Sequence, residues 1–259
     1  IKQQKVITAS ILLNMIAHAN LPFATPAEKA TLELAMGAFF FAMRSSEYTD
    51  VSGPRRTKPL SLRHIRFFRN NKALDLVDPT LLSATAISIT FKFQKTGIRH
   101  ETVHQDATIL PNLCPVKALA KVVRRVLSYP GCNTESLVST VLTNDKRRLV
   151  TSAFLATQLQ AAAKRIGPDV LRFSHLDVGT HSTRSGGAMA MYLAGVPVFT
   201  IMFIGRWSSD AFLWYICRQV LQFSAGVSTR MVSPQAQNFF TLPAFDADFD
   251  AKHPRTRSQ

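Results

Sequence analysis

Apolar residues recur at helical spacing along most of the chain. Residues 5–19 show this spacing, and so does the nearly all-apolar stretch that follows Thr25. Thr25 precedes Pro26 and is followed three residues later by Glu28, which is the arrangement of a capped helix start. Because the second helix is apolar on nearly all sides, we expect it in the core. Helical spacing returns over residues 116–128, 151–165, 182–194, 197–204 and 210–223.

Short alternating runs replace the helical spacing between Ser61 and about His104. Residues 86–93 alternate strictly, residues 94–97 (Gln-Lys-Thr-Gly) are typical of a hairpin turn, and residues 98–103 follow as the returning strand. The pattern as a whole predicts an α+β fold that is mainly α-helical and carries a small antiparallel β-sheet.

The net charge indicates the class of partner that the protein binds. The 259 residues include 31 Lys and Arg against 16 Asp and Glu, so the net charge is +15, while 46% of the residues are hydrophobic. A folded body with a strongly basic exterior favours a polyanionic partner, and we expect nucleic acid. The longest apolar stretch, residues 186–205, is interrupted by Gly195 and Pro197, so no membrane-spanning helix is expected.

Motifs of metal and phosphate-loop enzymes are missing from the sequence. Cys114, Cys132 and Cys217 form no CxxC pair, and the DADFD run at 246–250 lacks the Gly and the distal Glu of a calcium loop. The sequence contains no Gly-rich phosphate loop, HExxH or GxSxG. We therefore expect neither a metal nor a cofactor.

A set of cations, one tryptophan and one tyrosine remains near the C-terminal end of the helical region. His181 and Arg184 are three positions apart, Trp207 lies 23 positions after Arg184, and Tyr215 lies eight beyond Trp207. Each residue alone has an ordinary explanation, such as a capping histidine or a core aromatic ring. Those explanations weaken when the residues occur in this order, because the chain has only two tryptophans.

This order resembles the C-terminal signature of the tyrosine recombinases of the lambda-integrase and Cre type. Upstream, Arg44 followed by Glu47 resembles the first arginine motif of that family, and Lys95 resembles its β-hairpin lysine. The resemblance covers about residues 5–225, and the segment SSDAFLWYICRQV is closest to recombinases of eukaryotic mobile elements of the Crypton or DIRS type.

The resemblance implies a domain organisation and a cellular setting. It implies a tyrosine recombinase catalytic domain over residues 1–225 and a C-terminal extension over 226–259 that docks on a neighbouring subunit. A preceding helical core-binding domain would then be absent from this chain. The implied partner is double-stranded DNA, on which the protein assembles as a tetramer to recombine and integrate DNA. For a eukaryotic mobile element the implied location is the nucleus.

Two departures from the family pattern affect the site. The family often has a histidine where this chain has Trp207, although tryptophan occurs there in the Cre branch. The interval from Trp207 to Tyr215 is about one residue shorter than in that branch, so Arg206 is an alternative occupant of the position. The interval from Arg184 favours Trp207.

The implied reaction is metal-independent strand cleavage that leaves a 3′-phosphotyrosyl link. The implied catalytic residues are Arg44, Lys95, His181, Arg184, Trp207 and Tyr215. Arginine forks suit the developing charge on a phosphodiester, and Lys95 is the natural acid for the leaving 5′ oxygen. Glu47 is interpreted as a carboxylate that orients an active-site cation or imidazole.

Further basic residues are candidates for DNA contacts, which position a duplex without specifying its sequence. They are Arg55, Arg56, Arg63, Lys92 and Arg206, and their ordinary explanation is a solvated surface. Two other functions stay open at this point. One is DNA relaxation of the type IB topoisomerase kind, and the other is a DNA-binding protein of the same fold that has lost catalysis.

Overall fold

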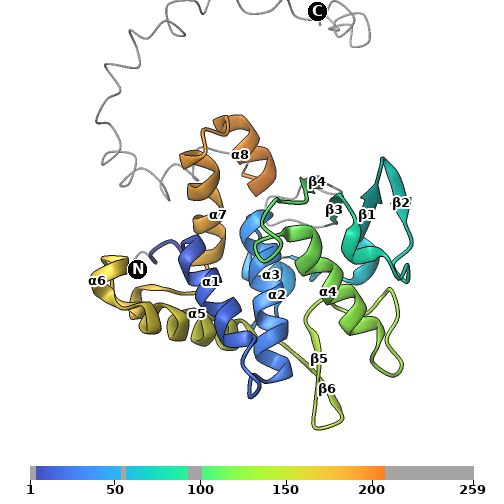
Figure 1. The fold of residues 1–259 in the computed structure, drawn as a ribbon, viewed down its shortest axis with the longest axis horizontal. Coiled ribbons are helices and arrows are strands. Elements are labelled where there is room, and N and C mark those ends of the chain that lie inside the picture. Colours follow the sequence, from blue (N-terminus) through green and yellow to red (C-terminus); the bar gives the residue numbers. More distant parts are fainter. Residues whose placement is uncertain (1–3, 54–56, 93–100, 208–259) are drawn as a thin grey trace, which may run out of the picture. The chain divides into compact units, whose positions relative to one another are not determined.

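Helix α2 (Pro26–Phe40) is the centre of the fold because it is apolar on nearly every side. The computed structural model describes residues 4–53, 57–92 and 101–207, and in this part of the chain α2 packs against α1 (Ala9–Ala19), α4 (Pro115–Leu127) and α7 (Ser182–Leu193) (Figure 1). The predicted capping box is present: the Thr25 hydroxyl accepts from the Glu28 N–H, and Glu28 accepts from the Thr25 N–H at 2.8 Å.

The other helices also follow the hydrophobic pattern. The structure contains α5 (Ser152–Ile166) and α8 (Val198–Gly205), together with the short helices α3 (Ser45–Tyr48) and α6 (Pro168–Leu171). Four predicted ranges agree with α4, α5, α7 and α8 to within a residue or two. The first predicted helix begins four residues later than expected, at Ala9, and the predicted helix over 210–223 lies outside the described residues.

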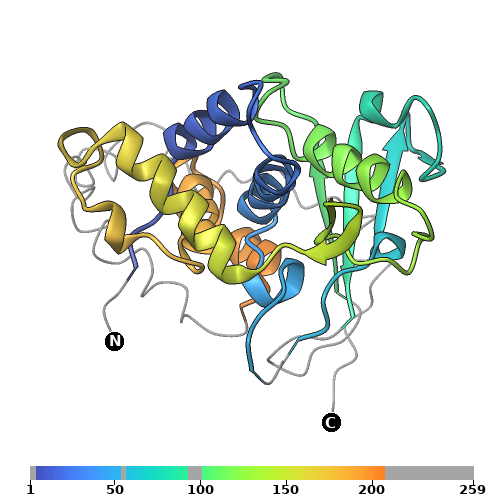
Figure 2. The same cartoon turned by 90° about the horizontal axis from the view of Figure 1, so that it is seen from below.

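The predicted small antiparallel sheet is confirmed. Its order is β2 (Lys72–Leu74), β1 (Ile65–Arg69), β3 (Ala86–Phe91) and β4 (Glu101–Asp106), and all neighbours are antiparallel. The alternation along β3 places Ile87, Ile89 and Phe91 in the core, where α4 packs against β3 and β4 (Figure 2). Phe91 pairs with Glu101, and the predicted turn between these strands lies outside the described residues.

A second hairpin was not predicted. It consists of β5 (Thr140–Thr143) and β6 (Lys146–Leu149), joined by Asn144 and Asp145. Both turn residues have positive φ, 51° and 57°, as a two-residue turn between right-twisted strands requires. The Asn-Asp pair was the available signal for this turn.

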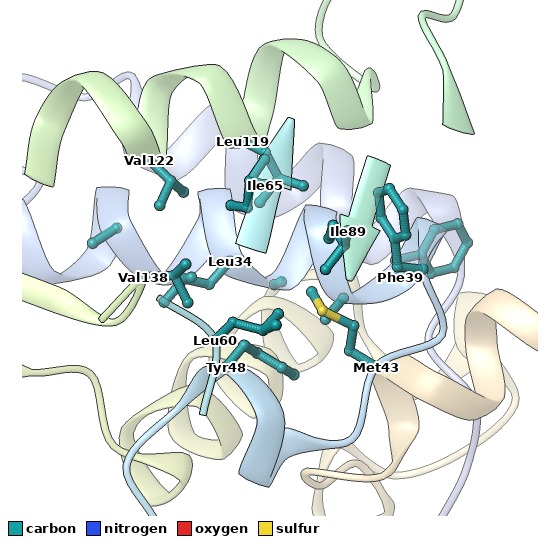
Figure 3. Packing of buried hydrophobic residues seen from close by; sticks show 14 of the residues in the cluster. Leu34, Phe39, Met43, Tyr48, Leu60, Ile65, Ile89, Leu119, Val122 and Val138 are labelled. Atoms are coloured by element: carbon teal, nitrogen blue, oxygen red, sulfur yellow. The ribbon is translucent and has the colours of Figure 1, made fainter. Parts of the chain in front are cut away.

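The core joins the helices to the sheet. Leu34 of α2 and Leu119 of α4 face Ile65 and Ile89 of the sheet, and Tyr48 of α3 lies below them (Figure 3). All described residues belong to one compact unit. A Cβ at Gly187 would lie 2.0 Å from the carbonyl oxygen of Phe39, so α7 approaches the end of α2 at a distance that only glycine allows.

Candidate active site

The chain reverses direction at the end of α2, and this turn carries the first predicted arginine. Ala42 adopts a left-handed conformation with φ 44°, and Arg44 then caps α3. The N–H of Arg44 donates to Glu47 Oε2 at 2.8 Å, and its Nη1 donates to Glu47 Oε1 at 3.1 Å. Glu47 is only 1% exposed, so its negative charge is held in place by the cations around it.

Arg184 lies in the first turn of α7 and reaches the same place from the other side. The residue is 4% exposed, and its guanidinium donates to two main-chain carbonyls, those of Ala42 and Gly205. The close approach of α7 to α2 at Gly187 places Arg184 beside the Ala42 turn. Arg184 thereby joins the end of α2 to the end of α8.

Trp207 covers Arg184. The guanidinium carbon of Arg184 lies 4.0 Å from the centroid of the Trp207 ring, which is a cation–π contact. The indole folds back over Gly205, where a Cβ would lie 1.6 Å from the ring. Glycine at position 205 is therefore required for this stacking, and Trp207, rather than Arg206, is the residue that lies on Arg184.

Arg206, the residue before Trp207, is buried. It has a left-handed conformation (φ 56°, ψ 49°) at the end of α8, which costs a non-glycine residue about 1–2 kcal/mol. Its Nη2 lies 2.8 Å from Glu47 Oε2, and its Nη1 donates to the carbonyls of Phe41 and Ile204 at 3.0 and 2.8 Å.

The interpretation of Arg206 as a DNA contact is corrected by this geometry. The side chain is fully buried, and its guanidinium is held by Glu47 and by the carbonyls of Phe41 and Ile204, so it does not lie on a surface that a phosphate backbone could contact. Desolvation by burial, together with the neighbouring charge of Arg44, lowers the pKa of Arg206, while Glu47 acts in the opposite direction. Sequence reasoning missed the contact between Arg206 and Glu47 because 159 positions separate them.

His181 marks the start of α7, where the sequence predicts it. It occupies the N-cap position, and its N–H donates to Gln4 Oε1 at 2.9 Å. The residue is exposed, whereas Arg184, one turn later, is buried. The same turn of helix therefore presents a titratable imidazole at the surface next to the buried guanidinium.

The remaining predicted residues fall into two groups. Lys95, Tyr215, Arg55 and Arg56 lie outside the described residues, so their roles stay predictions. The other group lies beside the sheet. Arg63 is exposed and forms an ion pair with Glu135 at 2.7 Å, and Lys92 is half-buried just after β3.

His64 was not singled out in the sequence, yet it lies within the electrostatic influence of both Lys92 and Arg63. Its Nδ1 accepts from the Ser61 N–H at 3.0 Å, and its buried Nε2 has no hydrogen-bond partner among the described residues. Burial, reinforced by the positive charges of Lys92 and Arg63, lowers the pKa of His64 from 6.5 to about 4. The imidazole is therefore neutral at pH 7.

We predict that His64 makes the fold less stable in mild acid. Between pH 6.5 and about 4 the unfolded chain binds a proton at this residue and the folded chain does not, so the free energy of unfolding falls as the pH drops through this range. The loss should be about 1–3 kcal/mol and should end below pH 4. Urea unfolding at a series of pH values measures it. His64→Asn, whose carbonyl can still accept from Ser61, should flatten this part of the profile; an unchanged slope would refute the assignment.

Comparison with known proteins identifies the fold. No family model matches the chain, and no curated protein matches it by sequence. Among solved structures, the chain is similar to the XerH site-specific recombinase bound to palindromic difH substrate in a post-cleavage complex. The TM-score is 0.54 at 15% identity, over 88% of this chain and 54% of that one. The chain has the fold of a tyrosine recombinase catalytic domain.

A second recombinase structure gives the same result. It is the XerH pre-cleavage complex with difH substrate, matched with a TM-score of 0.53 at 14% identity over 88% of this chain. The chain spans about half the length of these recombinase chains. Within the described part of the chain, no helix is long and apolar enough to cross a membrane, and no group of three acidic, histidine or cysteine side chains is placed to hold a metal ion.

Proposed function

We propose that this chain is the catalytic domain of a site-specific DNA recombinase that cuts and rejoins strands through Tyr215. The observation that carries the proposal is the cluster at the ends of α2 and α8, where Arg44 and Arg206 both pair with Glu47 and Arg184 donates to the adjacent carbonyls of Ala42 and Gly205. Such a surplus of buried cations suits an anion. A phosphodiester is the anion that the recombinase fold and the net charge of +15 both favour.

The arginines would stabilise the reaction electrostatically. As the phosphorus becomes five-coordinate, negative charge grows on its non-bridging oxygens, and guanidinium forks at Arg44 and Arg184 can donate to them. We infer that Trp207 and His181 add N–H donors, and this is supported by the contact of Trp207 with Arg184 and by the position of His181 at the start of the same helix. The guanidinium groups thereby supply the charge stabilisation that the step requires.

Two groups outside the described residues complete the proposed chemistry. The Tyr215 oxygen attacks phosphorus, the bond to the 5′ oxygen breaks, and Lys95 gives that oxygen a proton. A tyrosine of ordinary pKa is about one part in a thousand phenolate at pH 7, so nearby cations favour its deprotonation, and the proton passes to His181 in the proposed step. The new 3′-phosphotyrosyl link conserves the energy of the original bond, so religation needs no ATP.

Binding to DNA should depend steeply on salt. Each phosphate neutralised by Lys or Arg releases counterions and contributes about 0.9 to the slope of log affinity against log salt concentration. We expect a slope of about −4 or steeper for double-stranded DNA, measured by fluorescence anisotropy between 50 and 200 mM salt. Lys92→Ala should reduce the slope by about one. A slope near zero would show that the basic surface is not the binding face.

A two-site exchange assay tests the proposed function against its alternatives. A recombinase joins strands from two DNA sites, a topoisomerase relaxes one supercoiled molecule, and an inactive homologue binds without cutting. We expect exchanged products from paired sites, with assembly as a tetramer. The sequence around Tyr215 resembles recombinases of eukaryotic mobile elements. If the chain comes from such an element, the proposed reaction takes place in the nucleus. Relaxation without exchange would favour the topoisomerase alternative.

A further inference from the structure

We propose that Arg206 is a positioning residue that offsets the charge of Glu47 and so keeps the charge of Arg44 available for a phosphodiester. This inference rests on the proposed function, because it assigns a role within the same site. Arg206 would not touch the DNA. It would act through Glu47, and the consequence would appear in the cleavage rate rather than in DNA affinity.

The backbone of Arg206 supports a specific role for its side chain. Position 206 ends α8 in a left-handed conformation, where glycine or asparagine is favoured over arginine. From this conformation the side chain turns inward, between the carbonyls of Phe41 and Ile204, and reaches Glu47 at 2.8 Å. A residue chosen only to end the helix would not need a guanidinium in this place.

The two oxygens of Glu47 are divided between two cations. Oε1 lies 3.1 Å from Nη1 of Arg44, and Oε2 lies 2.8 Å from Nη2 of Arg206. A single pair of Arg44 and Glu47 would be neutral and would exert little attraction on a phosphate. With Arg206 on the second oxygen the group carries a net charge of +1, and the adjacent Arg184 raises it to +2.

That surplus matches the reaction. A phosphodiester carries one negative charge, and its oxygens gain more as the transition state forms. Glu101, which lies opposite Phe91 in the sheet, also acts electrostatically on Arg206, and with its charge counted the surplus is +1. The ring of Phe91 lies 3.6 Å below the guanidinium of Arg206 and fixes its plane.

A second buried ion pair between an arginine and a glutamate lies outside the site and can be compared with the pair of Arg44 and Glu47. Arg125 Nε lies 2.9 Å from Glu33 Oε2 between α4 and α2, and both side chains are largely buried. There one guanidinium contacts one carboxylate, and Lys121 also acts electrostatically on Glu33. Arg125 therefore provides the matched control: a similar buried ion pair, outside the site.

The test compares Arg206→Gln, Glu47→Gln and the double variant in single-turnover cleavage of nicked DNA at saturating protein. Arg206→Gln keeps an N–H donor for Glu47 but removes the charge, so we expect cleavage to slow about 10- to 100-fold with DNA affinity changed less than threefold. In the double variant Glu47 no longer neutralises Arg44, so its rate should return to within about fivefold of Glu47→Gln alone. Arg206→Lys should retain most of the rate.

A merely structural role predicts the opposite. The double variant would then be as slow as Arg206→Gln or slower, and that result would overturn the inference while leaving the proposed function intact. Arg125→Gln should lower the melting temperature without changing the cleavage rate. If Arg206→Gln does not fold, the double variant, in which no unpaired charge stays buried, is compared directly with Glu47→Gln. Similar cleavage rates in these two variants support the inference, and a slower rate in the double variant overturns it.

A measurement without catalysis separates this inference from the proposed function. Sulfate is used as a probe in place of the phosphodiester. The measured quantity is the melting temperature in sulfate minus that in chloride at equal ionic strength. We expect this rise to shrink in Arg206→Gln, to return in the double variant and to be unchanged in Arg125→Gln. Such a pattern in a protein that cleaves no DNA would support the role of Arg206 and refute recombination. A rise that is the same in all variants would overturn the inference.

Discussion

Replacing Arg184 with alanine is expected to slow covalent cleavage of DNA by about 1,000-fold or more. The guanidinium is held by the carbonyls of Ala42 and Gly205 and stacked on Trp207, so its orientation is fixed. Under the proposed function, an N–H of this fork faces the phosphate. Loss of one such preorganised donor group costs about 3–4 kcal/mol of transition-state stabilisation, and a second N–H from the same fork adds to this. Single-turnover rates on nicked DNA measure the loss.

Two variants control for effects of Arg184 on folding. Arg184→Lys keeps the charge without the fork, and we expect it to recover only part of the rate. Arg165→Ala removes an exposed arginine on α5 that donates to Asn14, and its cleavage rate should stay within about twofold of wild type. Cleavage by folded Arg184→Ala at a near wild-type rate would remove this residue from the mechanism.

Replacing Lys95 with alanine is expected to slow cleavage by about 100- to 10,000-fold, the range of a positioned proton transfer. The reason is chemical: a 5′ oxygen leaves poorly unless it gains a proton as the bond to phosphorus breaks. A substrate with sulfur in place of that bridging oxygen leaves as a stable thiolate and needs no acid. Lys95→Ala should therefore cut the sulfur-containing DNA at close to the wild-type rate.

Lys92 is the matched control for Lys95. It lies just after β3, half-buried within the electrostatic influence of His64, and we expect Lys92→Ala to reduce DNA binding more than the chemical step. Sulfur should also leave Arg184→Ala slow, because that residue stabilises charge and supplies no proton. If sulfur restores Lys92→Ala instead of Lys95→Ala, the assignment of the acid is wrong. If it restores neither, His181 becomes the next candidate.

The elements of the fold that were predicted are those set by local chemistry. The capping box at Thr25 and Glu28 fixes the start of α2 from four consecutive residues, and the alternation along β3 fixes which side chains face the core. The hairpin of β5 and β6 was missed because its strands are short and the outward-facing β6 is mostly charged. Only the Asn-Asp turn gave a local signal.

The structure brings some of the predicted site residues into contact, Arg44 with Glu47 and Arg184 with Trp207, while the roles assigned to them stay predictions. The contact of Arg44 with Glu47 follows from their spacing, since three positions bring the side chains together at a helix start. The burial of Arg206 does not follow from any spacing. It depends on the left-handed end of α8 and on the approach of α8 to the Ala42 turn, both of which are tertiary. Arg206, which precedes the predicted catalytic tryptophan, was therefore interpreted as a DNA contact, which was wrong.

The identity of the covalent link tests the central claim most directly. The protein is incubated with nicked suicide DNA, denatured in SDS and digested with protease, and the peptide that retains the nucleotide is sequenced by mass spectrometry. We expect an SDS-resistant adduct through a 3′ phosphate on Tyr215, formed equally in the presence of EDTA and absent from Tyr215→Phe. An adduct that persists in Tyr215→Phe, or cleavage that EDTA stops, would contradict the proposed mechanism.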